Sequence, residues 1–460
     1  MTRKETDSIG ELEVPDNVYW GINTQRALMN FKISGRTFSP EFIHSLAEVK
    51  KACLIANHAS GLVPDEIASA IQTAIDEVIQ GQFDDQFPID VYQTGSGTQT
   101  NMNMNEVLSN RANEILGHPR GTKSPVHPNN TVNMSQSSND VIPTAMHVST
   151  LKAIRDFLFP SLTKLQGALE DKIKQFKNIV KVGRTHLQDA VPIPLSTEFR
   201  VYKQQVESLQ SRDIASAVES LLFIPLGGTA LGTGLNAPKG FTERATKELS
   251  KITGFKFQTN PVQAEGISSH AAIVKTSAAL RSLALACVKM ANDIRWMGSG
   301  PRAGLGELVL PQNEPGSSIM PGKVNPTQSE ALIQVAIQVI GNDASIAAAE
   351  GYGSILDLNV TKPLMIANLL ESIRLLARGI DSFIDNCLVG LEANENRIKQ
   401  QLEQSLMVVT RLTPIIGYDK AAEVAKTAYT TGKSIREVVI ESGIDINGDL
   451  DEILDPTKMT

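Results

Sequence analysis

Residues 151–176 read "LKAIRDFLFPSLTKLQGALEDKIKQF", and the spacing of the apolar residues in this stretch decides the fold class. From Leu151 to Phe176 these residues recur at steps of 3, 4, 4, 3, 4, 4 and 3, so they line one face of a helix. Pro160 lies inside the pattern, where we expect it either to bend the helix or to occupy an outer face. The pattern predicts a helix over residues 143–177, about 50 Å long at roughly 1.5 Å per residue.

Four further stretches predict long helices: residues 195–223, 267–298, 327–350 and 361–390. Residues 267–298 are apolar on nearly every side, and 327–350 have the same character with many alanines. Faces this apolar are expected to be buried on several sides, in a bundle core that other subunits share. Strand signals are few, at 178–183 and 306–311.

We therefore expect a mainly α protein, with a central bundle of long helices between two smaller domains. The predicted domains are an N-terminal mixed helical domain at 1–136, the long-helix bundle at 137–393 and a small C-terminal helical domain at 394–460.

Composition bounds the class of partner and the compartment. The net charge of −7 argues against nucleic acid or an anionic membrane as the main partner. The three cysteines are far apart and form no CxxC pair, which argues against a zinc site or a disulfide framework and indicates a reducing compartment. We see no apolar leader segment and no uninterrupted apolar run of about 18 residues. The expectation is a cytoplasmic protein without a membrane partner.

Two glycine-containing stretches superficially resemble nucleotide-binding motifs. "GGTALGTGLN" at 227–236 contains a GxG but fits the dinucleotide fingerprint only loosely, so we interpret it as a structural loop. "TTGKS" at 430–434 lacks the first glycine of a P-loop, because position 427 is a threonine.

Three polar clusters each precede a predicted helix: "GSGTQTNMNMNEVL" at 95–108, "SQSSNDVIPTAMH" at 135–147 and "GKVNPTQSEAL" at 322–332. In the second, Asp140 is a plausible cap, with Pro143 in the first turn. One such cluster is ordinary helix capping. Three clusters favour a site for an anionic substrate, because the free N–H groups at helix starts bind anions.

Two of the seven histidines lie in notable loops. His127 stands in "VHPNN", where a structural role is the simpler interpretation. His186 stands in "GRTHLQD", close to Asp189, and a histidine paired with a carboxylate is an acid/base unit with a tunable pKa.

The loop "GSSIMPGKVNP" at 316–326 contains no His, Asp or Cys, yet it resembles the signature loop of the fumarase/aspartase superfamily of lyases. The resemblance covers essentially the whole chain. Within the superfamily, "GSGTQTNMN", "SQSSND", "GRTHLQDA" and "PGKVNPTQSEAL" resemble the class II fumarate hydratases.

The alternative within the superfamily is aspartate ammonia-lyase, which usually differs around Gln99 and has alanine where this chain has Gly322. A catalytically silent helical homologue is the alternative from another class. It is disfavoured because Ser317, Lys323 and His186 are all present.

The resemblance implies reversible hydration of fumarate to L-malate, through an aci-carboxylate carbanion. It makes Ser317 the base that removes a proton beside a carboxylate. A serine alkoxide needs support from backbone N–H groups and Lys323, as in an oxyanion hole. Lys323 and Asn325 are then expected to stabilise the negative charge that develops on the substrate.

The resemblance also places side chains around the two substrate carboxylates: Ser96, Thr98, Ser137, Ser138, Asn139 and Thr185. It makes His186 the partner of the water or hydroxyl, with Glu330 as the carboxylate that orients and charges this histidine. No metal or organic cofactor is implied, and the separated cysteines offer no ligation pattern for the iron–sulfur cluster of class I fumarases.

One feature departs from the pattern of the superfamily. Some members have a second carboxylate site at a turn with a basic residue just upstream. Here the turn consists of His127, Pro128, Asn129 and Asn130, and the expected basic position is Ser124. We therefore expect at most a weak accessory site at His127, Asn129 and Asn130.

Helix length predicts that the sites are shared between chains. "SSND" opens the helix at 143–177 and "GRTH" precedes the helix at 195–223, and consecutive helices of an up-down bundle run antiparallel. Ser138 and His186 of one chain should then lie too far apart for one small dicarboxylate. This argues for an oligomer, and the resemblance specifies a homotetramer whose sites draw on three chains.

Overall fold

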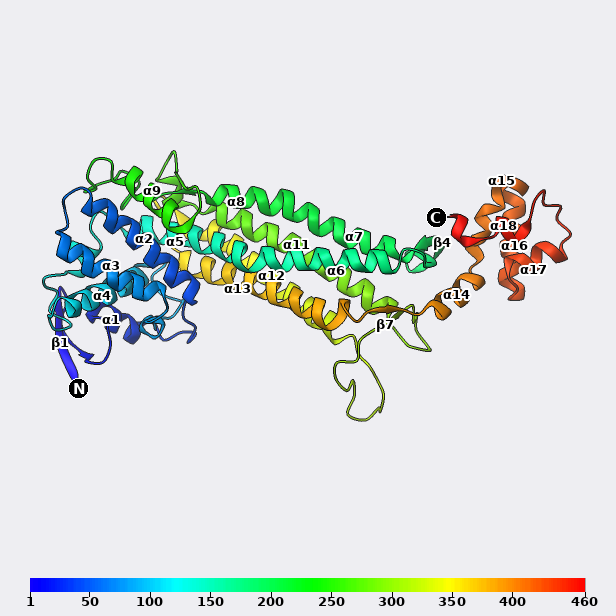
Figure 1. The fold of residues 1–460 in the computed structure, drawn as a ribbon, viewed down its shortest axis with the longest axis horizontal. Coiled ribbons are helices and arrows are strands. Elements are labelled where there is room, and N and C mark those ends of the chain that lie inside the picture. The colour runs from blue at the N-terminus through cyan, green and yellow to red at the C-terminus, as the bar shows by residue number, and fades with distance from the viewer. Residues whose placement is uncertain (460) are drawn as a thin grey trace. The chain divides into compact units, whose positions relative to one another are not determined.

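The structure, a computed structural model, describes residues 1–459, and the predicted mainly α architecture is confirmed (Figure 1). The chain forms two compact units, each assembled from three segments. The first unit comprises Met1–Pro160, Ser211–Ser282 and Ile337–Leu376, and the second comprises Ser161–Gln210, Leu283–Ala336 and the chain from Ala377 onward.

Every stretch predicted to form a long helix is helical. The elements are α5 (Ser138–Ala153), α6 (Phe159–Gln175), α7 (Leu195–Ser208), α8 (Ala215–Leu221), α11 (Ala271–Met297), α12 (Thr327–Gly353) and α13 (Lys362–Phe383). Three π-helical segments adjoin these helices, at Ile154–Leu158, Leu209–Ile214 and Ile384–Leu388. The apolar spacing of the sequence did not predict these wider turns.

The first π-helical segment precedes Pro160. The N–H of Phe159 donates to the carbonyl of Ile154, five residues back, and the helix continues past the proline as α6. A proline ring clashes with the carbonyl four residues before it, and a wider turn relieves that clash. Pro160 itself is exposed, as the outer-face expectation requires.

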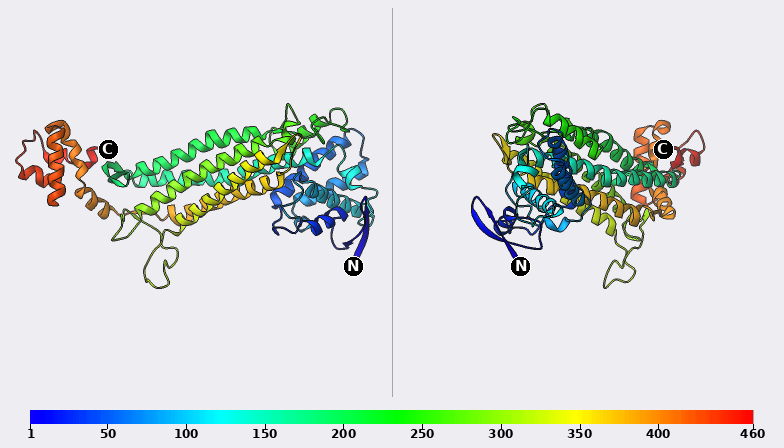
Figure 2. Two further views of the ribbon diagram at one scale, coloured as in Figure 1. Left: turned by 180° about the vertical axis from the view of Figure 1, so that it is seen from behind. Right: turned by 60° about the vertical axis from the view of Figure 1, so that its left-hand side comes forward.

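The first unit packs short helices around α2. Its further elements are β1 (Thr2–Asp7), β2 (Gly10–Pro15), α1 (Ile22–Asn30), α2 (Pro40–His58), α3 (Asp65–Ile79), α4 (Thr98–Ile115), β5 (Phe223–Ile224), α9 (Phe241–Thr253), β6 (Gln258–Thr259), α10 (Glu265–Ser268), β8 (Ser354–Ile355) and β9 (Leu358–Asn359). Helix α2 contacts α3, α5 and α9, and its inner face is buried. Figure 2 shows the dark-blue β1–β2 hairpin at the edge of these helices.

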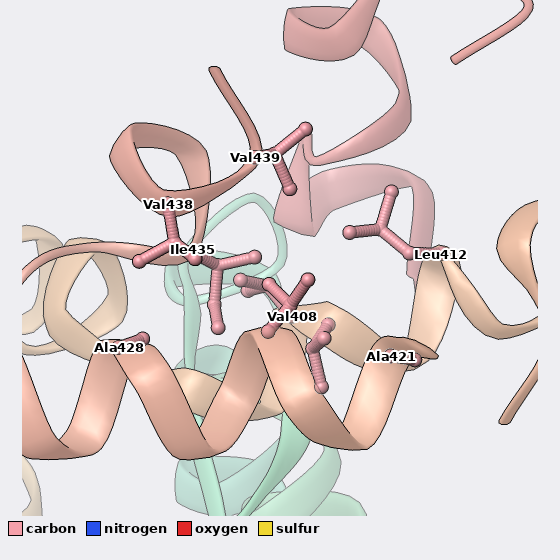
Figure 3. Packing of buried hydrophobic residues seen from close by; sticks show 9 residues of the cluster. Val408, Leu412, Ala421, Ala428, Ile435, Val438 and Val439 are labelled. Atoms are coloured by element: carbon pink, nitrogen blue, oxygen red, sulfur yellow. The ribbon is translucent and has the colours of Figure 1, made fainter. Parts of the chain in front are cut away.

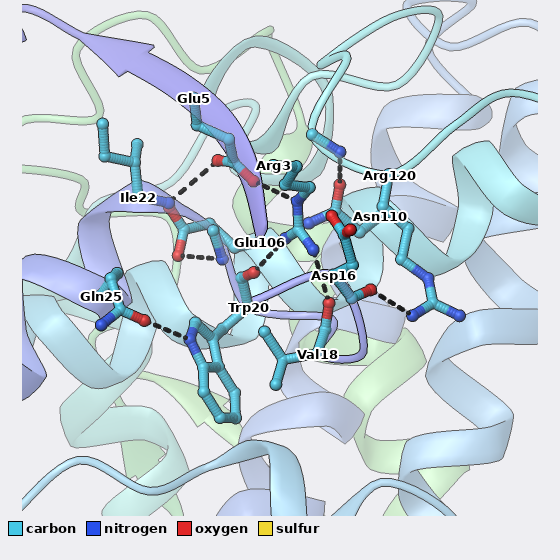
Figure 4. Close-up of polar contacts among 12 residues, drawn as sticks. Arg3, Glu5, Asp16, Val18, Trp20, Ile22, Gln25, Glu106, Asn110 and Arg120 are labelled. Atoms are coloured by element: carbon cyan, nitrogen blue, oxygen red, sulfur yellow. Dashed lines mark hydrogen bonds and ion pairs between the residues drawn. The ribbon is translucent and has the colours of Figure 1, made fainter. Parts of the chain in front are cut away.

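A buried polar network fixes the N-terminal hairpin and α1 against α4 (Figure 4). Glu106, on α4, accepts hydrogen bonds from the N–H groups of Gly21 and Asn23 at 2.9 and 2.8 Å. Glu5, on β1, accepts from the N–H of Ile22 at 3.0 Å and pairs with Arg3 at 2.8 Å. Two carboxylates thus satisfy the free N–H groups at the start of α1. Because Glu106 is one of them, these hydrogen bonds also attach α1 to α4, the helix that carries Thr98.

The second unit contains the hairpin of β3 (Val180–Thr185) and β4 (Gln188–Pro194) and the short pair of β7 (Leu308–Val309) and β10 (Glu392–Ala393). Both strand signals of the sequence, at 178–183 and 306–311, therefore correspond to strands. The C-terminal elements are α14 (Glu395–Gln404), α15 (Thr413–Ile416), α16 (Tyr418–Thr431), α17 (Ile435–Glu441) and α18 (Leu450–Ile453). Val408, Leu412, Val424, Ile435 and Val438 belong to their small buried core (Figure 3).

Helices α11 and α12 keep much of their apolar surface exposed. Both helices are long and apolar enough to cross a membrane. The core helices of soluble proteins often have the same length and composition, so these two features are only weak evidence for a membrane span. Of their most apolar stretches, 44% and 33% are buried. Leu285, Trp296 and Ile337 are among the exposed side chains.

Candidate active site

The first unit brings the starts of two helices together through three hydroxyl groups. Thr98 is the first residue of α4, and Ser138 is the first residue of α5. The hydroxyl oxygen of Thr98 lies 2.7 Å from that of Ser96 and 2.8 Å from that of Ser138. Two of the three predicted polar clusters therefore meet. Their combined hydroxyl groups and free helix-start N–H groups form a surface that suits a carboxylate.

The cap of α5 differs from the prediction. Ser137, not Asp140, is the N-cap residue: its hydroxyl accepts the N–H of Asn139 at 3.2 Å. Asp140 is the third residue of the helix and accepts the N–H of Ser137 at 2.9 Å, which completes a capping box. The expectation that Asp140 caps the helix was wrong because the helix begins three residues earlier than a cap at Asp140 requires.

Asp140 also ties the helix start to the glycine-containing loop at 227–236. Its second oxygen accepts the N–H groups of Gly227 and Thr229, both at 3.0 Å, and the amide of Asn139 donates to the carbonyl of Ala230 at 2.9 Å. Burial raises the pKa of Asp140 to about 6, against the opposing effect of these N–H donors. These contacts give the loop a structural role, and the absence of nucleotide binding stays a prediction.

A buried network below the hydroxyl groups was not found by sequence reasoning. Lys50 donates to the side-chain oxygens of Asn133 and Gln136, both at 2.9 Å. The same oxygen of Asn133 accepts from Asn101 and Asn105 of α4 at 3.1 and 3.2 Å. Burial lowers the pKa of Lys50 to about 7. The repeated Asn residues of "NMNMN" were visible in the sequence. Their link to Lys50 through Asn133 was not, because Lys50 lies on α2, far away in sequence.

The loop at 316–326 belongs to the second unit and surrounds the hydroxyl of Ser317. This oxygen accepts the backbone N–H groups of Ile319 and Met320 at 3.2 and 3.1 Å. Residues 312–317 and 320–324 line a cavity of about 350 Å³, and Ser317 and Lys323 are among them. The oxygen of Ser317 thus has two N–H donors, and Lys323 lines the same cavity. These groups would stabilise negative charge on that oxygen.

Asn325 and Gly316 hold the loop closed. The amide of Asn325 donates to the carbonyl of Gly316 at 2.7 Å, and the N–H of Gly316 donates to the carbonyl of Lys323 at 2.9 Å. A side chain at position 316 would place its Cβ 2.3 Å from that carbonyl oxygen, so glycine is required here. Pro326 lies directly before α12, as predicted, and Glu330 is exposed in the first turn of that helix.

Thr185 and His186 lie at the tip of the β3–β4 hairpin. His186 and Leu187 have left-handed φ values of 57° and 59°, as the two central residues of a tight hairpin turn do. Both Thr185 and His186 are exposed. Within residues 1–459 no hydrogen bond to the imidazole of His186 is recorded, and Asp189 stands opposite Arg184 in the hairpin. The partnership of His186 with Glu330 stays a prediction.

The turn of the expected accessory site uses its histidine internally. Nδ1 of His127 accepts the N–H groups of Asn129 and Asn130 at 3.1 and 3.2 Å. Burial, and secondly the charge of Lys123, lower the pKa of His127. Lys123, immediately before Ser124, supplies a basic residue, but its ammonium donates to the carbonyl of Thr6.

Comparison with known proteins identifies the family. Residues 10–341 match the family described as "Lyase", and residues 408–460 match "Fumarase C C-terminus". The chain is 52% identical over 442 residues to the class II fumarate hydratase of Thermosynechococcus vestitus, covering 96% of this chain and 94% of that protein. It is also 52% identical over 459 residues to the mitochondrial fumarate hydratase of Saccharomyces cerevisiae, covering 99% and 93% of the two chains.

Solved structures give the same result. The recombinant class II fumarase from Schistosoma mansoni matches with a TM-score of 0.97 at 39% identity, covering 100% of this chain and 99% of that one. The fumarate lyase:delta crystallin from Brucella melitensis matches with a TM-score of 0.96 at 43% identity and the same coverage. With the signature loop, the helix starts and the hairpin tip in place, the chain belongs to the class II fumarate hydratases, a family of lyases.

Proposed function

We propose that this protein catalyses the reversible hydration of fumarate to L-malate, the step of the citric acid cycle that its relatives are named for. Membership of the family supports the reaction, and one observation in the chain itself carries it: the oxygen of Ser317 accepts two backbone N–H groups at 3.2 and 3.1 Å. Such a site can lower the energy of an alkoxide, which is the base that the reaction requires.

In the direction from malate to fumarate, the proposed alkoxide of Ser317 takes a proton from the carbon next to a carboxylate. The electron pair of the broken C–H bond moves into that carboxylate and gives a doubly charged aci-carboxylate. Lys323 and Asn325 stabilise this charge. The intermediate then expels the hydroxyl group on the neighbouring carbon, and His186, oriented and charged by Glu330, supplies the proton with which it leaves as water.

The substrate carboxylates are proposed to bind to hydroxyl, amide and helix-start groups. The residues assigned to this role are Ser96, Thr98, Ser137, Ser138, Asn139 and Thr185. The contacts among Ser96, Thr98 and Ser138 at 2.7–2.8 Å support a shared role for the first unit's hydroxyl groups. An accessory carboxylate site at His127, Asn129 and Asn130 is proposed to be weak, because the turn already occupies Nδ1 of its histidine.

We further propose a soluble cytoplasmic homotetramer with composite active sites. Because a helix of the predicted length is about 50 Å long, "SSND" and "GRTH" of one site are assigned to different chains. The apolar surfaces that α11 and α12 leave exposed support burial against other copies rather than against water. The three-domain division at residues 136 and 393 stays a prediction.

The deciding experiment compares L-malate and L-aspartate as substrates for the purified protein. Fumarate formation is followed by its ultraviolet absorbance, and the reverse reaction is measured by malate formation from fumarate. Malate turnover without aspartate turnover is expected, because the chain has Gln99 and Gly322 at the positions where the ammonia-lyases usually differ. Ammonia release from aspartate would instead support the alternative lyase, and inactivity with both substrates would favour the silent homologue.

A further inference from the structure

A buried carboxylate below the catalytic hairpin has no role in the chemistry described so far. The side chain of Glu307 is fully buried, with 0% exposure. Its Oε1 accepts a hydrogen bond from Arg184 at 2.8 Å, and its Oε2 lies 3.5 Å from the ammonium of Lys181. Within the described chain Oε2 accepts no hydrogen bond. Burying a carboxylate is costly unless cations balance it, so this cluster needs an explanation.

The backbone of Glu307 is itself fixed at two points. Its N–H donates to the carbonyl of Met297, at the end of α11, and its carbonyl accepts the N–H of Asn394, both at 2.8 Å. Glu307 therefore presents its carboxylate from a rigid position. It lies on the segment that leads into the serine loop at 316–326.

The other side of the cluster is the hairpin that carries His186. Arg184 directly precedes Thr185, and its side chain is 15% exposed. The hairpin is irregular here, because the strand register shifts between Val182 and Arg184. This shift changes which residues face each other just before the turn, and the guanidinium then meets the carboxylate of Glu307.

His186 needs support from elsewhere because its own turn gives little. The residue is exposed, lies on a two-residue turn and receives no recorded hydrogen bond within residues 1–459. An acid/base group must be held close to its productive geometry, and displacements of about 1 Å cost on the order of 100-fold in rate. The side-chain interaction that ties this end of the hairpin to another segment is the pair of Arg184 and Glu307.

We propose that Glu307 is a positioning residue for His186. By holding Arg184, its carboxylate fixes the turn of Thr185 and His186 against the segment that leads into the serine loop. The inference deepens the proposed function and rests on it for the identity of the reaction. A purely structural reading, in which the cluster only stabilises the hairpin, is the competing explanation.

The test compares Glu307→Gln with Glu198→Gln. Glu198 is the matched control, because its carboxylate also faces Lys181, at 3.7 Å, but makes no recorded contact with Arg184. We expect Glu307→Gln to lower kcat for malate about 10- to 100-fold with KM changed less than about 3-fold, since displacement of His186 affects the chemical step more than binding. Glu198→Gln should stay within about 2-fold of the unmodified enzyme.

Two further measurements separate positioning from stability. If Glu307 acts through Arg184, then Arg184→Gln should lose a similar factor, and the double variant should lose no more than either single one. Hydrogen exchange at residues 184–188 should be faster in Glu307→Gln than in Glu198→Gln, while thermal midpoints and oligomeric state stay alike. This exchange measurement does not depend on the reaction, so it still tests the proposal if malate is not the substrate.

The conservative variant Glu307→Asp covers the case in which Glu307→Gln fails to fold. It retains the charge but withdraws the carboxylate from Arg184 by one methylene, and we expect kcat to fall several-fold. The proposal is overturned if folded Glu307→Asp or Glu307→Gln matches Glu198→Gln in kcat and in exchange at the turn. It is also overturned if kcat falls only in proportion to the loss of folded protein.

Discussion

At the scale of the residue, Ser317 is the proposed base on a loop that contains no conventional one. Its oxygen accepts two N–H groups of its own loop, and Lys323 lines the same cavity. Neighbouring Ser318 is exposed and has no recorded hydrogen bond within the described chain. Two adjacent hydroxyl groups of the same type therefore have different surroundings, and only one of them has the donors that an alkoxide requires.

This difference predicts unequal effects of two alanine substitutions. Ser317→Ala should lower malate turnover by at least about 10³-fold, because it removes the proposed base. Ser318→Ala should lower it much less. Both variants should remain folded and assembled, since the positions lie on a loop outside the core. Steady-state kinetics with L-malate, together with native mass spectrometry of the assembly, provides the check. Turnover by Ser317→Ala close to that of the unmodified enzyme would contradict the assignment.

At the scale of the element, the local features of the fold were readable from the sequence. Apolar spacing predicted the long helices after residue 143, and the polar clusters at 95–108 and 135–147 were correctly expected to lead into helices, which begin at Thr98 and Ser138. The π-helical segments were not predicted, because one wider turn hardly changes the spacing of apolar residues. The cap was placed wrongly at Asp140 because the apolar spacing also does not fix the exact residue at which a helix begins.

The interactions that link distant elements could not be predicted. Glu307 stands in "GELVLP", where nothing distinguishes a buried carboxylate from an ordinary strand residue. Lys50 contacts Asn133 and Gln136 across more than 80 positions of sequence. Such contacts depend on how elements pack, which periodicity does not describe. The candidate site was therefore predictable from its local motifs, whereas the residues that contact it from distant elements required the structure.

Helix α5 gives a prediction on pH. His147 is buried, its Nδ1 donates to the carbonyl of Leu221 at 3.0 Å, and burial lowers its pKa to about 4. Between pH 6.5 and pH 4, His147 is protonated in the unfolded chain but stays neutral in the folded chain. The free energy of unfolding therefore falls as pH falls through this window. His147→Asn should remove up to about 3 kcal/mol of that fall, at about 1.4 kcal/mol per pKa unit.

Denaturant unfolding at several pH values between 6.5 and 4 measures this effect. His118→Asn is the control, because it removes a histidine that is exposed rather than buried. Some slope should survive in His147→Asn, because burial also lowers the pKa of His270. Identical slopes for His147→Asn and the unmodified protein would rule out the contribution of His147.

At the scale of the whole molecule, two features bear on whether one chain is the active unit. They are the exposed apolar faces of α11 and α12 and the separation of "SSND" from "GRTH" that helix length predicts. Fewer than half of the residues in the most apolar stretch of either helix are buried. A shared site predicts that two inactive variants can restore each other. The variants are Ser138→Ala/Asn139→Ala and His186→Asn.

Each variant is unfolded, mixed in equal amounts with the other and refolded. If "SSND" and "GRTH" of a site come from different chains, random assembly gives about one quarter of the sites both intact segments, since each segment is intact in half of the chains. Malate turnover should then recover to about one quarter of the unmodified level. If one chain supplied both segments, every site would stay inactive. Activity no higher than in either variant, with mixed assemblies verified by native mass spectrometry, would exclude shared sites.

The hydrogen bonds to Ser317 also determine the direction in which it acts. A hydroxyl oxygen has two lone pairs, and both are occupied by the N–H groups of Ile319 and Met320. The hydroxyl group can then interact with a further partner only by donating its O–H hydrogen, which points away from these two amides. Once this hydrogen has left, the newly exposed lone pair has the same direction. In the proposed role of Ser317 as base, the backbone thus aims its oxygen before any substrate arrives.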